Sequence, residues 1–185
     1  MEPGTFAGGE RLVQRVERIL KDRWYQEYLL RNATREAKRR FCRHNFQHML
    51  DVARVAYILM LEAGDLQVFV RQYSLSGREA AREIIYAAGL LHDIGRWEEY
   101  DHQQDHAAAS ARLAKELMSR TGFTPLEIDI VTRAIGEHRR RDAHETLLGR
   151  YLHAADRLSR PCLSCPVQAD CHWFADRRRQ AYFTY

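Results

Sequence analysis

The sequence predicts an all-α protein, and three observations lead to that class. Apolar residues recur with the period of an α-helix along most of the 185 residues. No stretch alternates apolar and polar residues for long enough to form a convincing strand, although residues 66–73 come closest. Two capping boxes, Ser76-Gly-Arg-Glu and Thr124-Pro-Leu-Glu, precede apolar runs, as they do at helix starts. We therefore expect one domain made of packed helices.

The predicted helices follow one another with short connections. Residues 10–40 form a long, charged, amphipathic helix, and residues 41–63 form a second one that Gly64 can end in the left-handed conformation. Pro125 suits the first turn of a later helix, because its missing N–H costs nothing there. The remaining predicted helices cover residues 76–94, 104–120, 125–138 and 144–159.

The length of 185 residues favours a single domain with attached terminal segments. We interpret residues 1–40 as an N-terminal helical extension packed on the same domain and residues 41–160 as the main domain. Residues 161–185 form a cysteine-containing C-terminal tail.

Composition excludes several classes of protein. Hydrophobic residues make up 45% and charged residues 29% of the chain, which argues against a disordered or low-complexity protein. The longest apolar run, Val55 to Leu61, is far shorter than the roughly 20 residues of a membrane-spanning helix. The first residues lack the features of a secretory signal. A net charge of +4 is too small to imply nucleic-acid binding. We expect a cytoplasmic protein without membrane or nucleic-acid partners.

Histidines and aspartates lie on the apolar faces of five predicted helices, where polar residues are unexpected. Each one could be a core residue satisfied by a single hydrogen bond. Taken together, they would need five separate partners, and each unpaired buried group costs about 1–3 kcal/mol. One or two divalent cations would satisfy them all, and imidazoles with carboxylates suit Fe, Mn, Zn or Co better than Ca or Mg. The residues are His44 and His48, His92 with Asp93, His106, His138 and Asp156.

The order of these residues resembles a known superfamily. His48 is followed by Met-Leu-Asp-Val-Ala-Arg, His92 and Asp93 lie in the run Leu-Leu-His-Asp-Ile-Gly, and Asp156 ends Tyr-Leu-His-Ala-Ala-Asp. This pattern is similar to that of the HD-domain metal-dependent phosphohydrolases over about residues 41–160. The resemblance implies an HD-domain helical bundle that cleaves a phosphate ester or anhydride through metal-activated hydroxide. It also implies a small phosphorylated substrate, with a nucleotide expected.

Two further segments resemble members that bind two metal ions, such as bacterial diadenosine tetraphosphate hydrolases and cyclic-dinucleotide phosphodiesterases. They are Asp-His106-Ala-Ala-Ala-Ser and Ala-Ile-Gly-Glu-His138. The cyclic-dinucleotide branch is disfavoured, because its Gly-Tyr-Pro signature is absent and Arg139 follows His138. The resemblance implies one or two divalent transition metals: Fe, Mn or Co, with Zn also possible. The implied ligands are His48, His92, Asp93 and Asp156 for the first ion and Asp93, His106 and His138 for the second.

Some assignments near these ligands stay open. His44 lies one turn before His48 and His102 one turn before His106, so either could replace its neighbour. In the implied mechanism Asp93 is catalytic, and Arg96 and Arg139 are phosphate clamps, although each could be a surface arginine. Glu98 and Glu99 could carry protons or could be solvated partners of arginine.

The four cysteines of the chain are candidates for a second, structural metal site. Cys162, Cys165 and Cys171 have a Cys-x2-Cys pair plus a third cysteine, and Cys42 lies two residues before His44. Thiolates in such spacing bind zinc or an iron–sulfur cluster. Zinc is favoured slightly, because a structural site folds a tail that has little core. Buried thiols without a metal are the alternative.

Two other functions are compatible with this pattern. One is a non-catalytic protein, a metal or redox sensor or an adaptor. The other is a mixed-valent di-iron oxygenase on the same scaffold, which would consume oxygen and require iron.

Overall fold

The structure is a computed structural model that describes residues 13–140 and 145–172, and within these ranges it is all-α with no strand. The predicted fold class is confirmed. Residues 173–185 of the predicted tail and His144 at the start of a predicted helix lie outside the described residues. The helices are α1 (Gln14–Lys21), α2 (Arg23–Arg35), α3 (Phe46–Glu62), α4 (Asp65–Gln72), α5 (Arg78–Leu91), α6 (Arg96–His102), α7 (His106–Ser119), α8 (Pro125–Glu137) and α9 (Leu147–Leu158), followed by the 3₁₀ turns η1 (Cys162–Ser164) and η2 (Gln168–Asp170).

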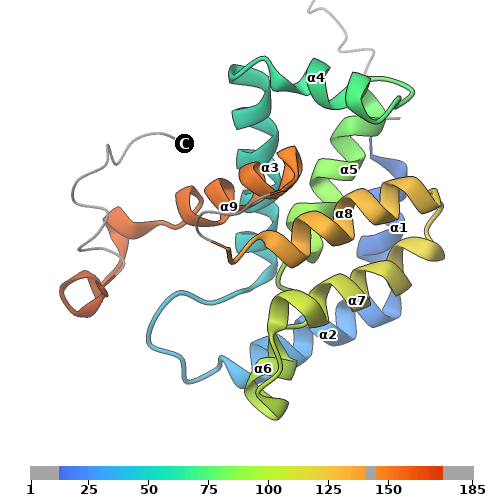
Figure 1. The fold of residues 1–185 in the computed structure, drawn as a ribbon. Helices are drawn as coiled ribbons and strands as arrows, with labels where there is room; N and C mark the ends of the chain where they lie inside the picture. Colours follow the sequence, from blue (N-terminus) through green and yellow to red (C-terminus); the bar gives the residue numbers. More distant parts are fainter. Residues whose placement is uncertain (1–12, 141–144, 173–185) are drawn as a thin grey trace, which may run out of the picture.

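The helices α3 and α5 form the centre of the bundle and pack against each other (Figure 1). Their backbones come very close at Gly89, where a Cβ would lie 2.4 Å from the Cα of Ala53. Only glycine fits this crossing, because any side chain would meet the backbone of the other helix. The helices α8 and α9 pack on this pair, and α7 packs on α8. The large buried side chains at these contacts include Ile84, Ile85 and Leu91.

The N-terminal helices α1 and α2 are fastened to the other helices by polar contacts. Arg15 pairs with Glu83 of α5 at 2.6 Å and with Glu127 of α8 at 2.7 Å. Asn32 of α2 is fully buried; its Nδ2 donates to the carbonyl of Asp93, and its Oδ1 accepts from the backbone N–H of Trp97. The helix α2 therefore braces the turn that carries the His-Asp pair.

The structure differs from the sequence prediction at three elements. The long helix expected over 10–40 is two helices, because Asp22 has an extended backbone and its side chain caps α2 at the N–H of Trp24. The strand-like residues 66–72 belong to α4, which begins directly after Gly64, and Tyr73 is the C-cap residue of this helix. A short helix, α6, lies between the predicted helices 76–94 and 104–120. Its sequence is mostly polar and contains only two turns, so periodicity does not reveal it.

Of the three helix ends predicted from the sequence, the structure confirms two and contradicts one. Gly64 adopts the left-handed conformation with φ of 73°, as expected. The capping box at Thr124 is confirmed, with both of its hydrogen bonds present. The capping box at Ser76 is wrong, because α5 starts at Arg78 and its N-cap residue is Gly77, which has no side chain to cap the helix. In the described part of the chain, no helix has both the length and the apolar character needed to cross a membrane.

Candidate metal centre

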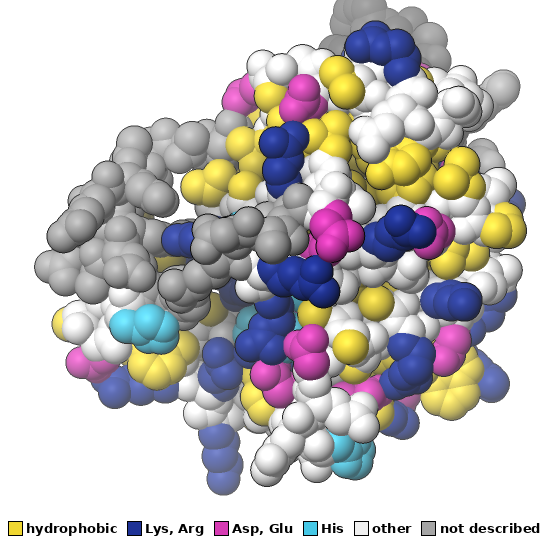
Figure 2. All heavy atoms as spheres, viewed as in Figure 1, with side chains coloured by type: hydrophobic (Ala, Val, Ile, Leu, Met, Phe, Trp, Pro, Cys, Tyr) yellow, Lys and Arg dark blue, Asp and Glu magenta, His cyan; other side chains and the backbone are white. Residues whose placement is uncertain are grey.

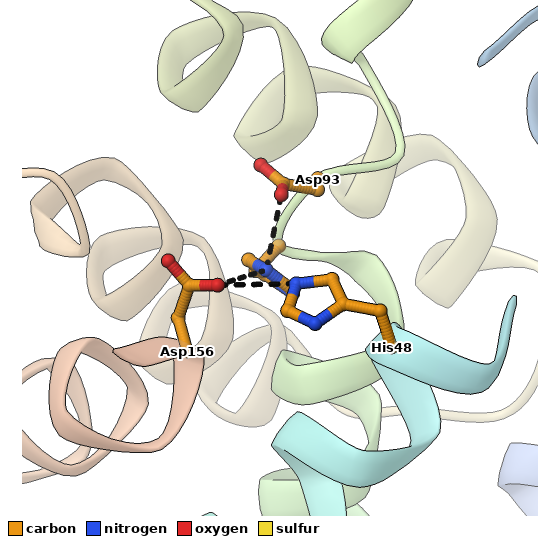
Figure 3. A group of neighbouring side chains, drawn as sticks. His48, Asp93 and Asp156 are labelled. Carbon is orange, nitrogen blue, oxygen red and sulfur yellow. Dashed lines mark ion pairs between the residues drawn. The ribbon is translucent and has the colours of Figure 1, made fainter. Parts of the chain in front are cut away.

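The side chains of His48, His92, Asp93 and Asp156 converge at one point inside the bundle. One ligand atom from each lies within 4.8 Å of those from the others. His48 comes from α3, Asp156 from α9, and the His-Asp pair from the end of α5 and the turn after it (Figure 3). The Nε2 atom of His48 lies 3.1 Å from Oδ1 of Asp156, and Nε2 of His92 lies 3.3 Å from Oδ2 of Asp93. Three separate parts of the chain therefore build one four-residue group.

A second group shares Asp93 with the first and adds His106 and His138. The Oδ1 atom of Asp93 lies 3.1 Å from Nε2 of His106 and 3.7 Å from Nε2 of His138. The other carboxylate oxygen, Oδ2, faces His92 of the first group. Asp93 thus presents one oxygen to each group. This arrangement lets a single carboxylate bridge two ions.

Hydrogen bonds orient the histidine rings with one nitrogen toward the centre. The Nδ1 atom of His92 donates to the carbonyl of Gly89 at 2.7 Å, and Nδ1 of His138 donates to the carbonyl of Ile135 at 2.6 Å. A carbonyl can only accept, so Nδ1 of each ring carries a proton and Nε2 is the nitrogen that faces the centre. The Nδ1 atom of His106, which points away from Asp93, lies 2.5 Å from Oε2 of Glu99. Such outer contacts are typical of metal-binding histidines.

Unpartnered atoms at the centre fit a bound cation. Among the described residues, Nε2 of His48, Nε2 of His92 and Oδ1 of Asp93 are buried and lie close to opposite charges, but none of them makes a well-aligned hydrogen bond. Buried polar atoms are rarely left in this state, because each one has lost its bonds to water. Nitrogen and carboxylate donors that converge in this way suit a divalent transition metal. The residues present therefore fit the metal that the sequence pattern implies.

The charges at the centre are those a cation requires. Burial alone would raise the pKa of Asp93, but His92 and His44 hold it well below its usual value. Burial would likewise raise the pKa of Asp156, but Arg160 and His48 hold it well below. Both carboxylates are therefore ionised. Burial lowers the pKa of His48 to about 4, so this ring is neutral at pH 7 and its Nε2 lone pair can bind a cation.

His92 carries a proton when no cation is present. Burial would lower its pKa, but Asp93 and Asp156 outweigh burial and raise the pKa to about 10. A cation that binds Nε2 must displace this proton, so metal binding releases a proton from the protein.

The two alternative histidines lie outside both groups. The Nδ1 atom of His44 contacts Oε1 of Glu36 at 2.5 Å, and its Nε2 lies 3.7 Å from Oδ2 of Asp93. His44 thus lies behind Asp93 and belongs to neither ligand group. His102 lies on α6 with its ring edge against Trp97. The structure brings together the six residues that the resemblance implied as metal ligands, namely His48, His92, Asp93, His106, His138 and Asp156.

Comparison with known proteins identifies the family. Residues 45–160, more than half of the chain, match the family described as HD domain. The chain belongs to the HD domain family. It is similar to an uncharacterized protein of Clostridium beijerinckii, with 34% identity over 166 residues that cover 90% of this chain and 96% of the relative.

A second relative shares only part of the chain. A bifunctional uridylyltransferase/uridylyl-removing enzyme of Bradyrhizobium diazoefficiens is 33% identical over 86 residues, which cover 45% of this chain and 9% of that enzyme. No solved structure matches this HD domain protein.

A cavity of about 500 Å³ opens onto the centre of the HD domain, and its lining is rich in arginine. Figure 2 shows Lys and Arg side chains over the face in view, several of them near its middle. Arg96 and Arg139, both predicted from the sequence, line this cavity. The Nη1 atom of Arg96 lies 2.9 Å from Nε2 of His106, and Nη1 of Arg139 donates to Asp105 at 2.9 Å. Glu98 pairs with Arg112 at 2.5 Å, which assigns that carboxylate a structural contact.

Sequence reasoning missed two residues at the centre. Glu36 accepts from the backbone N–H of His44 at 2.7 Å and from the hydroxyl of Tyr100 at 2.7 Å. Arg160 donates to Oδ1 of Asp156 at 2.7 Å and lines the cavity. Its position four residues after Asp156 is the one signal in the sequence that could have suggested this pair.

The structure does not confirm the predicted cysteine site formed by Cys42, Cys162, Cys165 and Cys171. Among the described residues, no three of these thiols have sulfur atoms within 4.8 Å of one another. Cys162 and Cys165 flank one 3₁₀ turn, and a second turn, η2, separates them from Cys171. Cys42, Cys162 and Cys171 instead line the same cavity as the histidines. The cysteine metal site therefore stays a prediction.

Proposed function

We propose that this protein is a metal-dependent phosphohydrolase that uses two divalent transition-metal ions. One observation carries the proposal: the two oxygens of Asp93 face two separate groups of histidines inside the HD domain. In two-metal sites, paired cations serve the in-line displacement reactions of phosphate chemistry. His48, His92, Asp93 and Asp156 would hold one ion, and Asp93, His106 and His138 would hold the other.

The chain's own residues would prepare the phosphate for attack. Bound divalent cations would supply Lewis-acid chemistry, which acidifies water and polarises a phosphoryl oxygen. Arg96 and Arg139 line the same cavity and are proposed to bind the phosphoryl oxygens, where their charge offsets the negative charge that develops. Glu99 would keep the His106 ring in place through its contact with Nδ1.

The substrate is proposed to be a nucleotide or a related small phosphate ester. Phe41 lines the cavity and is 42% exposed as a residue, so its ring is available to stack on a base. The relative named as a uridylyl-removing enzyme supports this class, because a uridylyl group is a nucleotide unit.

The test combines elemental analysis with a screen of nucleotides and phosphate esters in the presence of Mn, Fe or Co. We expect up to two ions per chain and release of phosphate or of a nucleotide. Oxygen consumption with a strict iron requirement would favour the oxygenase, and metal binding without turnover would favour the sensor or adaptor.

Two variants test the residues themselves. Asp93→Asn removes the shared carboxylate charge, so both ions and turnover should be lost; the fall in activity should exceed the roughly 10- to 100-fold typical of outer-shell residues. His138→Ala should halve the metal content. His102→Ala is the matched control, because His102 lies outside both groups. An unchanged metal content in Asp93→Asn would contradict the assignment.

A further inference from the structure

Arg160 has a hydrogen-bonding state that differs from that of Arg96 and Arg139. Its side chain is only 14% exposed and is held to α9 by two bonds to Asp156, from Nε to the backbone carbonyl and from Nη2 to Oδ1. Its third nitrogen, Nη1, is buried and has no hydrogen-bond partner among the described residues. Arg160 also lines the cavity above the ligand groups.

The orphaned donor stays charged and is fixed in position. A guanidinium keeps its proton in proteins, so the charge of Arg160 does not depend on its surroundings. Because Nη2 is anchored on Asp156, the planar guanidinium cannot turn freely, and the direction of Nη1 is set. By contrast, Nη1 of Arg96 contacts His106 and Nη1 of Arg139 donates to Asp105. Among these three arginines, Arg160 is the one whose buried donor lacks an acceptor.

A phosphoryl oxygen is the acceptor that matches this donor. Guanidinium groups bind phosphate through charge-assisted hydrogen bonds, and the low-dielectric surroundings of a buried donor strengthen such a bond. Asp156, which Nη2 of Arg160 contacts, also faces His48, and Asp93 faces His92 and His106.

We propose that Arg160 binds a phosphoryl oxygen of the substrate through Nη1 while its Nη2 holds Asp156 in place. This inference rests on the proposed phosphohydrolase function and adds a phosphate-binding residue to it. One guanidinium would then connect a metal ligand directly to the reacting group.

The experiment measures inorganic phosphate binding by calorimetry to the manganese-loaded protein, with metal content determined on the same samples. Arg160→Gln and Arg160→Lys are compared with Arg133→Gln. Arg133 is an exposed arginine of α8 that pairs with Asp129 and does not line the cavity. We expect phosphate affinity to fall on the order of 10- to 100-fold in both Arg160 variants and to stay unchanged in Arg133→Gln.

The lysine variant separates phosphate binding from a purely structural role. Lysine keeps a positive charge near Asp156 but lacks the planar guanidinium that can donate to two acceptors at once. Arg160→Lys should therefore retain its metal and lose phosphate affinity. Loss of metal from both variants would overturn the proposal in favour of a role limited to positioning Asp156. Unchanged phosphate affinity in a metal-loaded variant would also overturn it. These outcomes are independent of the substrate screen, which tests the proposed function itself.

Discussion

At the scale of single residues, a few buried polar side chains build the candidate metal centre of this HD domain. Asp93 offers one oxygen to each ligand group, and Glu36 and His44 form a buried pair directly behind it. Glu36 accepts three hydrogen bonds, two of them from His44 and one from Tyr100. It thereby links the loop before α3 to α6.

The Glu36 contacts predict a defined dependence of stability on pH. Burial would raise the pKa of Glu36, but His44 and Tyr100 outweigh burial and lower it from 4.5 to about 2. A carboxylate whose pKa is lowered in the folded state stabilises the protein above its ordinary pKa. That contribution, on the order of 3 kcal/mol, should disappear as the pH falls from 4.5 toward 2.

Denaturant unfolding of the metal-free wild type and of Glu36→Gln, repeated between pH 6 and roughly pH 2, checks this prediction. The difference in unfolding free energy between the two proteins should shrink with acidification, because only the wild type loses the Glu36 contribution. A difference that stays constant over this range would contradict the lowered pKa.

At the scale of helices, the crossing of α3 and α5 positions the first ligand group. His48 lies in the first turn of α3, and His92 and Asp93 follow α5 directly. The close contact between Ala53 and Gly89 sets the distance between the two backbones. The carbonyl of Gly89 also accepts the hydrogen bond from His92. One glycine therefore serves both helix packing and ligand orientation.

Gly89→Ala should destabilise the fold by about 1–3 kcal/mol, because the added methyl group meets the Ala53 backbone and forces the helices apart. Gly136→Ala is the matched control: a Cβ there meets no atom within 4 Å, so alanine should be neutral or stabilise α8 by up to about 1 kcal/mol. Thermal and denaturant unfolding measure both variants. Equal stability of the two would show that the α3–α5 contact adapts to a methyl group.

At the scale of the whole molecule, the candidate metal centre joins helices that are far apart in the sequence. The ligand groups use α3, the turn after α5, α7, the end of α8, and α9. Without a cation, several buried donors and acceptors there have no hydrogen-bond partner among the described residues. A bound cation would cross-link these helices and satisfy those atoms. We therefore expect metal binding and folding to be thermodynamically linked.

Removal of metal with a chelator should lower the melting temperature. At a free metal concentration of about 100 times the dissociation constant, binding contributes about 2.7 kcal/mol, which corresponds to roughly 5–10 °C for a chain of this length. Calorimetry with and without chelator measures the shift. The melting temperature of Asp93→Asn should not respond to chelator, and a wild type equally insensitive would contradict the linkage.

The sequence by itself determined the helical class and which residues face the core, because amphipathic periodicity depends on neighbours within one helix. The positions of His48, His92, Asp93, His106, His138 and Asp156 on apolar faces were visible in the same way, and the structure brings these six together. The short polar helix α6 and the division at Asp22 lacked such a pattern.

Only the tertiary structure decided how these faces meet. It placed His48 rather than His44 in the four-residue group, gave Asp93 an oxygen for each group, and set Arg160 at the cavity. Periodicity states which side of a helix is buried. It does not state which residues of other helices lie opposite, because helix packing and close contacts such as that at Gly89 set those distances.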